Sequence, residues 1–245
     1  MLCVDSVAIR RISSLGSLTL VLALASAGVA GATTWHDGDL VTYDEGAWVT
    51  DPSDANKLLL DKYPYVYEST FNFFLLGGVA PWFSVEFSDS NFLIAYLPAS
   101  GPIGPFDANL LNPTSTAAGA FGGEVAALKL NVDFSDAGFL LGTTGLHFGD
   151  LVLHDLGLPG IDGLTVSQFL ALANTAISGA PTSQPIATID PITQQLNASF
   201  DGVAGPYVSQ WAQDHLDAPV PEPGTFLLLG SGIAGLVLFG RTKRG

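Results

Sequence analysis

Apolar and polar positions alternate in several stretches of the chain between residues 33 and 160. The clearest case is Glu124–Phe134, where apolar side chains stand at every second position, as in a half-buried strand. Trp82–Phe87 alternates in the same way, and Phe92–Leu97 is an apolar run that predicts a central strand. Further strands are predicted at Tyr65–Leu76 and Leu146–Leu153. We therefore expect residues 33–160 to form a β-rich body.

The period of the pattern changes over residues 161–219, which we expect to be the helical C-terminal part of the same domain. Thr165 and Gln168 have the spacing of a capping box, and apolar residues recur at helical intervals as far as Ile177. Asp190-Pro191 is typical of a helix start, and a third short helix is expected at about Tyr207–Leu216. The predicted fold class is mainly β (α+β), an antiparallel β-sandwich-like body with two or three C-terminal helices.

The N-terminus has the layout of a secretory signal peptide, which we assign to residues 1–32. Two arginines, Arg10 and Arg11, precede an apolar stretch. Ala30 and Ala32 then form a small-x-small cleavage site directly before Thr33. The residues that flank the arginines fit a twin-arginine signal poorly, so we expect general secretion.

The last 26 residues, 220–245, consist of three ordered parts. The parts are the step Val220-Pro221-Glu222-Pro223, the uncharged apolar run 224–240, and a basic end with Arg241, Lys243 and Arg244. The two prolines disfavour a continuous helix, so they display Glu222 on a stiff, extended stretch. The apolar run predicts a transmembrane helix of roughly 25 Å, shorter than the roughly 30 Å hydrocarbon core. The basic end is expected on the cytoplasmic side. An ordinary membrane anchor is the alternative to a temporary one.

These residues resemble the PEP-CTERM sorting signal of Gram-negative bacteria. The resemblance is carried by Val220–Thr225, by Leu227–Gly230 and by the basic end, whose cluster is interrupted by Thr242. It implies that exosortase, a membrane protease-transpeptidase, recognises the Pro-Glu-Pro step and removes the hydrophobic tail. The protein would be anchored transiently in the inner membrane and then released to the cell surface or the exopolysaccharide matrix. Parts of the body are similar to uncharacterised surface proteins with the same tail, and this similarity implies no activity.

Charge and cysteine content narrow the function classes open to the body. Residues 33–219 hold 21 acidic side chains and three basic ones, Lys57, Lys62 and Lys129. Such a surface repels phosphates, which excludes nucleic acid as a partner. The single cysteine, Cys3, lies in the signal peptide, so the mature protein has no disulfide, thiol nucleophile or thiolate metal site. We expect a soluble exported domain that is held together by a hydrophobic core.

The candidates for acid–base chemistry near neutral pH are the four histidines, His36, His147, His154 and His215. Asp150 and Asp155 are close enough in sequence to orient His154. However, the chain has no Gly-x-Ser-x-Gly elbow and no His-Glu-x-x-His motif. His147 and His154 are seven positions apart, on opposite faces of one predicted strand. We therefore predict no catalytic residues and no enzyme.

Two acid-rich loops offer oxygen ligands of the kind that calcium prefers. The loops contain Asp37, Asp39, Asp44 and Glu45, and separately Asp51 and Asp54. Their spacing is not that of an EF-hand, and solvated acidic loops are the alternative. We therefore predict no metal site and no cofactor, with calcium left open.

Four aromatic residues offer a stacking platform for polysaccharide on one sheet face, with ordinary core packing as the alternative. They are Trp35, Trp48, Trp82 and Tyr96. Glu68 and Glu86 are one possible carboxylate pair for a glycoside hydrolase, which needs two carboxyl groups about 5 to 10 Å apart. Nothing in the sequence selects this pair from the other acids.

The sequence thus predicts an exported protein that exosortase sorts to the cell surface or exopolysaccharide matrix, with a structural or adhesive role and no catalysis. The alternative is a polysaccharide-binding module of the extracellular matrix. The expected partners are exosortase, the inner membrane for a short time, and exopolysaccharide.

Overall fold

The computed structural model describes residues 33–50, 53–68, 73–203, 205 and 207–219. The predicted signal peptide and the sorting step Val220–Pro223 lie outside these residues, as do the transmembrane helix 224–240 and the basic end. Of the described residues, 43% are helical and 11% lie in strands. The prediction of a mainly β, sandwich-like body is therefore wrong. No helix in the described part of the chain is long and apolar enough to span a membrane.

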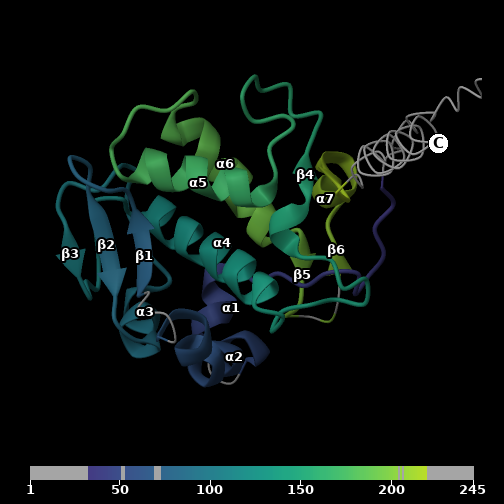
Figure 1. The fold of residues 1–245 in the computed structure, drawn as a ribbon, viewed down its shortest axis with the longest axis horizontal. Coiled ribbons are helices and arrows are strands. Elements are labelled where there is room, and N and C mark those ends of the chain that lie inside the picture. The colour runs from purple at the N-terminus through teal and green to yellow at the C-terminus, as the bar shows by residue number, and fades with distance from the viewer. Residues whose placement is uncertain (1–32, 51–52, 69–72, 204, 206, 220–245) are drawn as a thin grey trace, which may run out of the picture. The chain divides into compact units, whose positions relative to one another are not determined.

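The largest correction concerns the strand predicted at Glu124–Phe134, which is part of helix α4 (Ala120–Asp136). Figure 1 shows α4 between α5 (Val166–Ile177) and α6 (Ile186–Asn197) on one side and α1 (Glu45–Val49) on the other. A helix covered on most of its faces carries apolar residues all round, so its sequence loses the helical period. The same apolar positions then fit a two-residue period, which explains the wrong prediction.

A second predicted strand, Phe92–Leu97, lies mostly in helix α3 (Ser90–Tyr96). The Asp89 carboxylate accepts hydrogen bonds from the backbone N–H groups of Asn91, at 2.7 Å, and Phe92, at 3.3 Å. This N-cap satisfies donors that have no partner within the helix, and it starts a helix where the apolar run predicts a strand.

Two more helices lie in the predicted β-rich body. Asp44 caps α1, and Ser53 caps α2 (Asp54–Tyr63), each by accepting a hydrogen bond from a backbone N–H in the first turn. The predicted strand Tyr65–Leu76 begins as a short π-helix, Pro64–Glu68, and only its end lies in strand β1 (Phe74–Gly77).

The main sheet has three short strands in the order β1-β2-β3, with β2 at Ser84–Phe87 and β3 at Leu110–Leu111. β2 runs antiparallel to β1 and parallel to β3. It lies within the predicted strand Trp82–Phe87, and Val85 and Phe87 are buried on one face as the alternation indicates. Figure 1 shows this sheet at one end of α4, next to α5.

Two further sheets consist of two-residue strands. β4 (Val152–Leu153) pairs with β7 (Leu216–Asp217), and β5 (Phe200–Asp201) pairs with β6 (Tyr207–Val208), both antiparallel. The predicted strand Leu146–Leu153 contains a 3-10 turn, Phe148–Asp150, and only its last two residues form β4.

The helices predicted after residue 160 are all present. Helix α5 has the predicted capping box, with Thr165 and Gln168 each hydrogen-bonded to the other's backbone N–H. Helix α6 begins at Ile186, four residues before the predicted start at Asp190, so Pro191 lies inside the helix and not at its first position. Helix α7 (Gln210–His215) lies within the third predicted span and is capped by Ser209.

Candidate functional site

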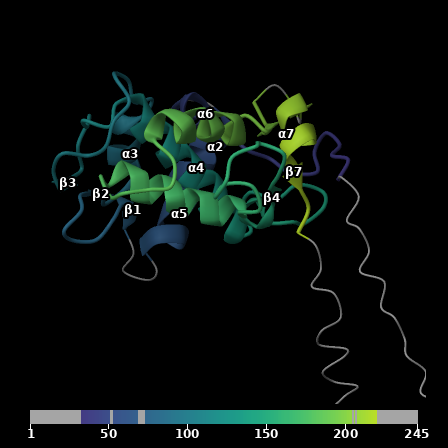
Figure 2. The ribbon, with the colours of Figure 1, turned by 90° about the horizontal axis from the view of Figure 1, so that it is seen from above.

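The two ends of the described chain meet, and we call this contact the end junction: Thr33, Trp35, Gln213, Leu216, Asp217 and Ala218. The Thr33 backbone N–H donates to Asp217 Oδ1 at 2.8 Å, and the Ala218 N–H donates to Thr33 Oγ1 at 2.9 Å. Figure 2 shows both ends beside α7 and β7. The end junction therefore holds the residues that directly precede the predicted sorting signal.

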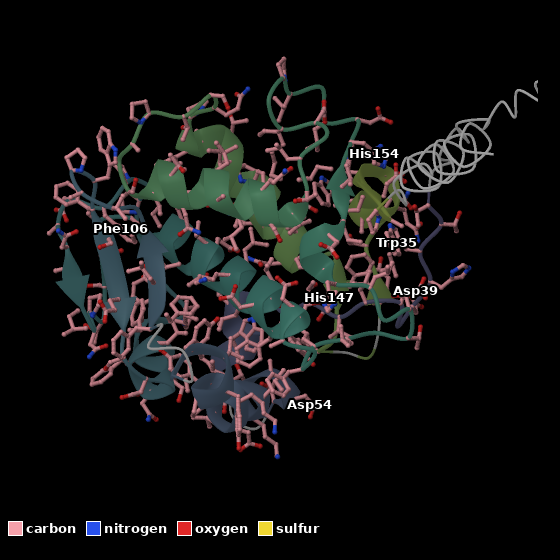
Figure 3. The ribbon with its side chains drawn as sticks, viewed as in Figure 1. Trp35, Asp39, Asp54, Phe106, His147 and His154 are labelled. Carbon is pink, nitrogen blue, oxygen red and sulfur yellow. The ribbon has the colours of Figure 1, made fainter. Side chains whose placement is uncertain are left out.

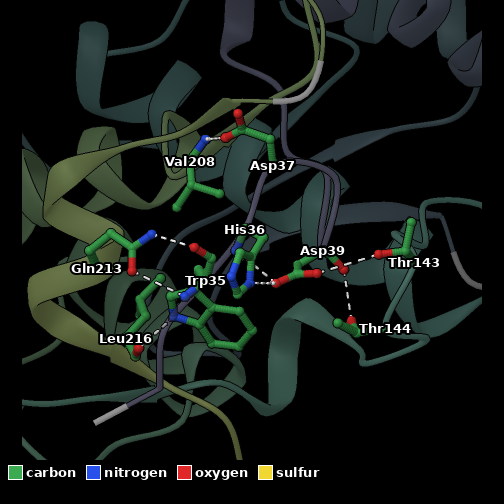
Figure 4. A network of polar contacts seen from close by, with 9 residues as sticks. All are labelled: Trp35, His36, Asp37, Asp39, Thr143, Thr144, Val208, Gln213 and Leu216. Atoms are coloured by element: carbon green, nitrogen blue, oxygen red, sulfur yellow. Dashed lines mark hydrogen bonds and ion pairs between the residues drawn. The ribbon is translucent and has the colours of Figure 1, made fainter.

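Trp35 anchors the N-terminal side of the end junction (Figure 4). Its backbone N–H donates to Gln213 Oε1 at 3.0 Å, and its carbonyl accepts from Gln213 Nε2 at 2.6 Å. The indole Nε1 donates to the Leu216 carbonyl at 2.7 Å, and the ring meets the Phe200 ring edge-on. Trp35 is 3% exposed, so it is a core residue and not part of a sugar-binding platform.

His154 lies beside Asp217, where β4 pairs with β7. Its Nε2 atom is 3.6 Å from Asp217 Oδ2, and its Nδ1 atom is 3.2 Å from Asp155 Oδ2. Among the described residues, the buried Nε2 atom has no hydrogen-bond partner. His215 Nδ1 lies 3.1 Å from the His154 carbonyl. The predicted orientation of His154 by Asp155 is thus present, and Asp217 is a second acidic neighbour.

His147 has a different surrounding from His154 (Figure 3). Its Nδ1 atom is 2.9 Å from the Ser135 carbonyl and 4.0 Å from Asp136 Oδ1, at the end of α4. The two histidines do not share a strand, since a 3-10 turn that ends at Asp150 separates His147 from β4. Each histidine therefore contributes to a local packing contact of its own.

The acidic loop at residues 36–39 is held by hydrogen bonds to neighbouring segments (Figure 4). Asp39 Oδ2 accepts from the His36 N–H at 2.8 Å, and its Oδ1 lies 3.4 Å from Thr143 Oγ1. Asp37 Oδ1 accepts from the Val208 N–H at 3.0 Å. These carboxylates accept hydrogen bonds from the protein's own N–H and hydroxyl groups. They do not converge on one point, as the ligands of a calcium ion would.

The remaining acids of the calcium hypothesis are also separate. Asp44 caps α1, Asp54 is the first residue of α2, and Asp51 lies outside the described residues. No group of three or more His, Cys, Asp or Glu side chains among the described residues could hold a metal ion. The described loops therefore give calcium no support.

Three carboxyl groups gather where α1, α4 and α6 meet, and we call them the carboxyl cluster: Glu45, Glu124 and Asp190. Glu45 accepts a hydrogen bond from the Ala99 N–H at 3.1 Å, and Glu124 accepts one from Asn197 Nδ2 at 2.9 Å. Asp190 Oδ2 accepts from Gln194, while its buried Oδ1 atom has no hydrogen-bond partner in the described structure. Gly123 has no side chain here because a Cβ atom would collide with the Glu45 carboxylate.

Burial raises the pKa of all three groups in the carboxyl cluster. Burial and then the charge of Glu124 raise the pKa of Glu45 to about 7, against a weaker lowering effect of the Ala99 hydrogen bond. Burial also raises the pKa of Glu124 and of Asp190, each opposed by a hydrogen bond from a side-chain amide. Burial disfavours the charged form of a carboxyl group, so ionisation of the cluster opposes folding.

Only one residue of the predicted aromatic platform is open to solvent. Trp48 and Tyr96 are buried like Trp35, whereas Trp82 is 39% exposed. Trp82 borders a groove of about 490 Å³ that Leu75, Val79, Asn174 and Thr175 also line. The prediction of a four-residue aromatic platform is therefore wrong. Of the four residues, Trp82 alone is exposed, and it lies at the edge of this groove.

The predicted carboxylate pair gives no support to a hydrolase. Glu86 lies in β2 and is paired with Leu75 of β1 and Leu111 of β3. The side chain of Glu68 lies outside the described residues.

Neither the end junction nor the carboxyl cluster could be predicted from the sequence. Thr33 and Asp217 are 184 positions apart, and neither stands in a motif that marks the contact. The glycine pair Gly122-Gly123 stands directly before Glu124 in the sequence. Such a pair indicates a turn more readily than a helix whose backbone lies against a neighbouring side chain.

Residues 219–244 match the family model of the PEP-CTERM protein-sorting motif. The match contains all the predicted sorting residues, Val220, Pro221, Glu222, Pro223, Arg241, Lys243 and Arg244. The predicted resemblance is thus confirmed, and the motif implies exosortase as the processing partner and a surface or extracellular location. Neither the curated proteins nor the solved structures gave a match to this chain.

Proposed function

We propose that this protein, which carries a PEP-CTERM sorting motif, remains at the cell surface or in the exopolysaccharide matrix as a structural or adhesive component without catalysis. The observation that carries the proposal is the position of the motif. It begins at residue 219, directly after β7 and the Ala218–Thr33 hydrogen bond. Removal of the tail beyond this point leaves the described hydrogen bonds of the body intact.

The path to the surface includes two steps at the inner membrane. The signal peptide 1–32 directs export and is removed after Ala32, and the apolar run 224–240 then anchors the chain, with Arg241, Lys243 and Arg244 on the cytoplasmic side. Exosortase cuts at or near the Pro-Glu-Pro step and releases the body.

The roles of the charged groups support a body without catalysis. The carboxylates of the loop at residues 36–39 accept hydrogen bonds from backbone N–H groups. His147 and His215 each contact a backbone carbonyl. The carboxyl cluster lies where three helices meet, and its members do not line the Trp82 groove. The loop acids and the two histidines thus make local contacts within the fold, and the acidic surface keeps the exported protein soluble.

Replacing both Pro221 and Pro223 by alanine tests the sorting step. The double variant keeps the apolar run but loses the stiff display of Glu222, so we expect it to stay in the membrane fraction with its tail. The exposed substitution Asp214→Asn is the matched control and should be processed normally. Normal release of the double variant would contradict recognition of the Pro-Glu-Pro step.

The Trp82 groove favours a second candidate, a polysaccharide-binding module. Its lining combines an exposed indole and aliphatic side chains with Asn174 and Thr175, and it includes no charged residue. Ligand sites for neutral molecules are typically concave and apolar, with a few polar groups. An acidic body would repel an anionic glycan, so a neutral polysaccharide is the better fit.

Affinity electrophoresis in gels that contain the host's exopolysaccharide tests this candidate. We expect the protein to be retarded, and Trp82→Ala to remove most of the retardation. Phe92→Ala is the matched control, because Phe92 is 40% exposed, lies on α3 and is not among the residues that line the groove. Equal mobility with and without polysaccharide, or equal retardation of Trp82→Ala, would rule the groove out.

A further inference from the structure

The end junction contains a bond that signal cleavage would change. In the uncut chain, the Thr33 nitrogen is an uncharged amide that donates a hydrogen bond to Asp217 Oδ1 at 2.8 Å. We propose that cleavage between Ala32 and Thr33 turns this nitrogen into an α-ammonium group that forms an ion pair with Asp217. This ion pair then holds Asp217 and Ala218, the residues directly before the sorting motif, against the new N-terminus. The inference rests on the proposed removal of the signal peptide after Ala32.

The chemical step is a peptide hydrolysis. One water molecule is consumed, Ala32 leaves with a carboxylate, and Thr33 keeps its nitrogen as an ammonium group. The Asp217 carboxylate is the charged partner before cleavage, and the ammonium group makes the donor charged as well, so the hydrogen bond becomes an ion pair. The donor and acceptor atoms already lie at bonding distance, so the ion pair can form without rearrangement of the body.

The positions of both partners are fixed by other contacts. Asp217 belongs to β7 and is paired with Val152 of β4. On the other side, two backbone hydrogen bonds to Gln213 and the buried indole bond to Leu216 hold Trp35, two residues after Thr33. The Thr33 hydroxyl also accepts the Ala218 N–H. Thr33 and Asp217 are thus brought together from both ends of the folded body.

The new ammonium group would be a cation beside Asp217, where no lysine of the described residues lies. The three lysines of the body have partners elsewhere: Lys57 pairs with Asp61, Lys129 pairs with Asp133, and Lys62 lies over the rings of Tyr65 and Phe139. The titratable groups that face Asp217 are His154, at 3.6 Å, and beyond it Asp155 and His215. His154 contacts Asp217 directly, so its effect must be separated from that of the amino group.

The acylation rate of the α-amino group tests the ion pair, because only the neutral amine reacts. The full chain is produced in its exosortase-bearing host, the mature protein is purified, and labelling of Thr33 by an amine-selective reagent is followed by mass spectrometry from pH 6 to 10. A free α-amino group has a pKa of about 7.7 to 8.0. With Asp217 as partner, we expect a midpoint about one unit higher, and so about tenfold slower labelling near neutral pH.

Four variants make the result specific. Asp217→Asn should restore the ordinary midpoint, whereas Asp214→Asn, an exposed acid on α7, should leave the raised midpoint unchanged. His154→Gln separates the histidine titration and should also keep the midpoint raised. An alanine inserted between Ala32 and Thr33 retains Asp217 but moves the ammonium group by one residue, so it should label at the ordinary rate. If Asp217→Asn does not fold, the labelling rate of the insertion variant still tests whether the ion pair forms.

Two different failures are distinguishable. The intact mass gives the first residue of the mature protein, and a start other than Thr33 would refute both the proposed cleavage and the ion pair. A start at Thr33 with equal labelling of the wild type, Asp217→Asn and the insertion variant would refute the ion pair alone, and it would leave the signal cleavage standing.

Discussion

A single half-buried carboxyl group, that of Glu45, makes the stability of the body depend on pH. Its carboxyl group bonds the Ala99 N–H, faces the Glu124 charge and lies against Gly123. Because its pKa in the folded state is about 7, the folded protein holds a proton that the unfolded chain releases near pH 4.5. Its contribution to stability is therefore fully present below pH 4.5 and is lost as the pH rises through 7.

Glu45→Gln is expected to stabilise the body above pH 7. Glutamine keeps an acceptor for Ala99 and removes the charge that faces Glu124, so the gain, after discounting for solvent screening, is about 1 kcal/mol. The gain should vanish below pH 4.5. Urea unfolding at pH 4 and pH 8 measures the difference, with the exposed substitution Asp107→Asn as the control. A gain that is the same at both pH values would show that ionisation of Glu45 is not its cause.

At the scale of elements, helix α4 depends on a buried polar residue that connects it to its neighbours. Asn131 is fully buried, accepts the Tyr43 N–H at 2.9 Å and donates to the Tyr43 carbonyl at 2.8 Å. It also donates to Asn197 Oδ1 of α6 at 3.1 Å. One side chain thus joins α4, α6 and the segment before α1.

Asn131→Leu is expected to destabilise the body by about 2 to 4 kcal/mol, because it leaves the Tyr43 backbone groups buried without partners. Asn91→Leu, at an exposed position of α3, is the control. The free energy of unfolding in urea provides the measurement. A loss of stability no larger than that of the control would mean that the Tyr43 segment finds other partners.

The elements that could be predicted from the sequence are those with a local signal. The capping box of Thr165 and Gln168 and the one-sided apolar face that follows predict α5 correctly. Helix α4 has neither signal, because it starts at a glycine without a side-chain cap and is covered by other helices. That this segment is a helix and not a strand depends on packing between segments distant in sequence. The spacing of apolar residues along one segment carries no information about such packing.

The same distinction holds for the candidate site. The sorting residues Val220–Pro223 and the basic end are contiguous, so their order alone identifies them. Thr33 and Asp217 meet only after folding, and the buried state of Trp35 follows from the same contact. The sequence therefore predicts the destination of the protein, whereas the contact between Thr33 and Asp217 could be found only from the structure.

At the scale of the whole molecule, the described body begins and ends at one junction, between a predicted cleavage site and a matched sorting motif. Thr33 follows the first, and Ala218 precedes the second by one residue. Both predicted proteolytic steps would therefore leave the described contacts of the body intact.

The intact mass of the protein in the surface fraction, with and without exosortase in the host, tests this account most directly. We predict a chain that starts at Thr33 and has lost residues 226–245 when exosortase is present, and a full-tailed chain in the membrane fraction when it is absent. A surface protein that retains residues 226–245 in the presence of exosortase would contradict the account.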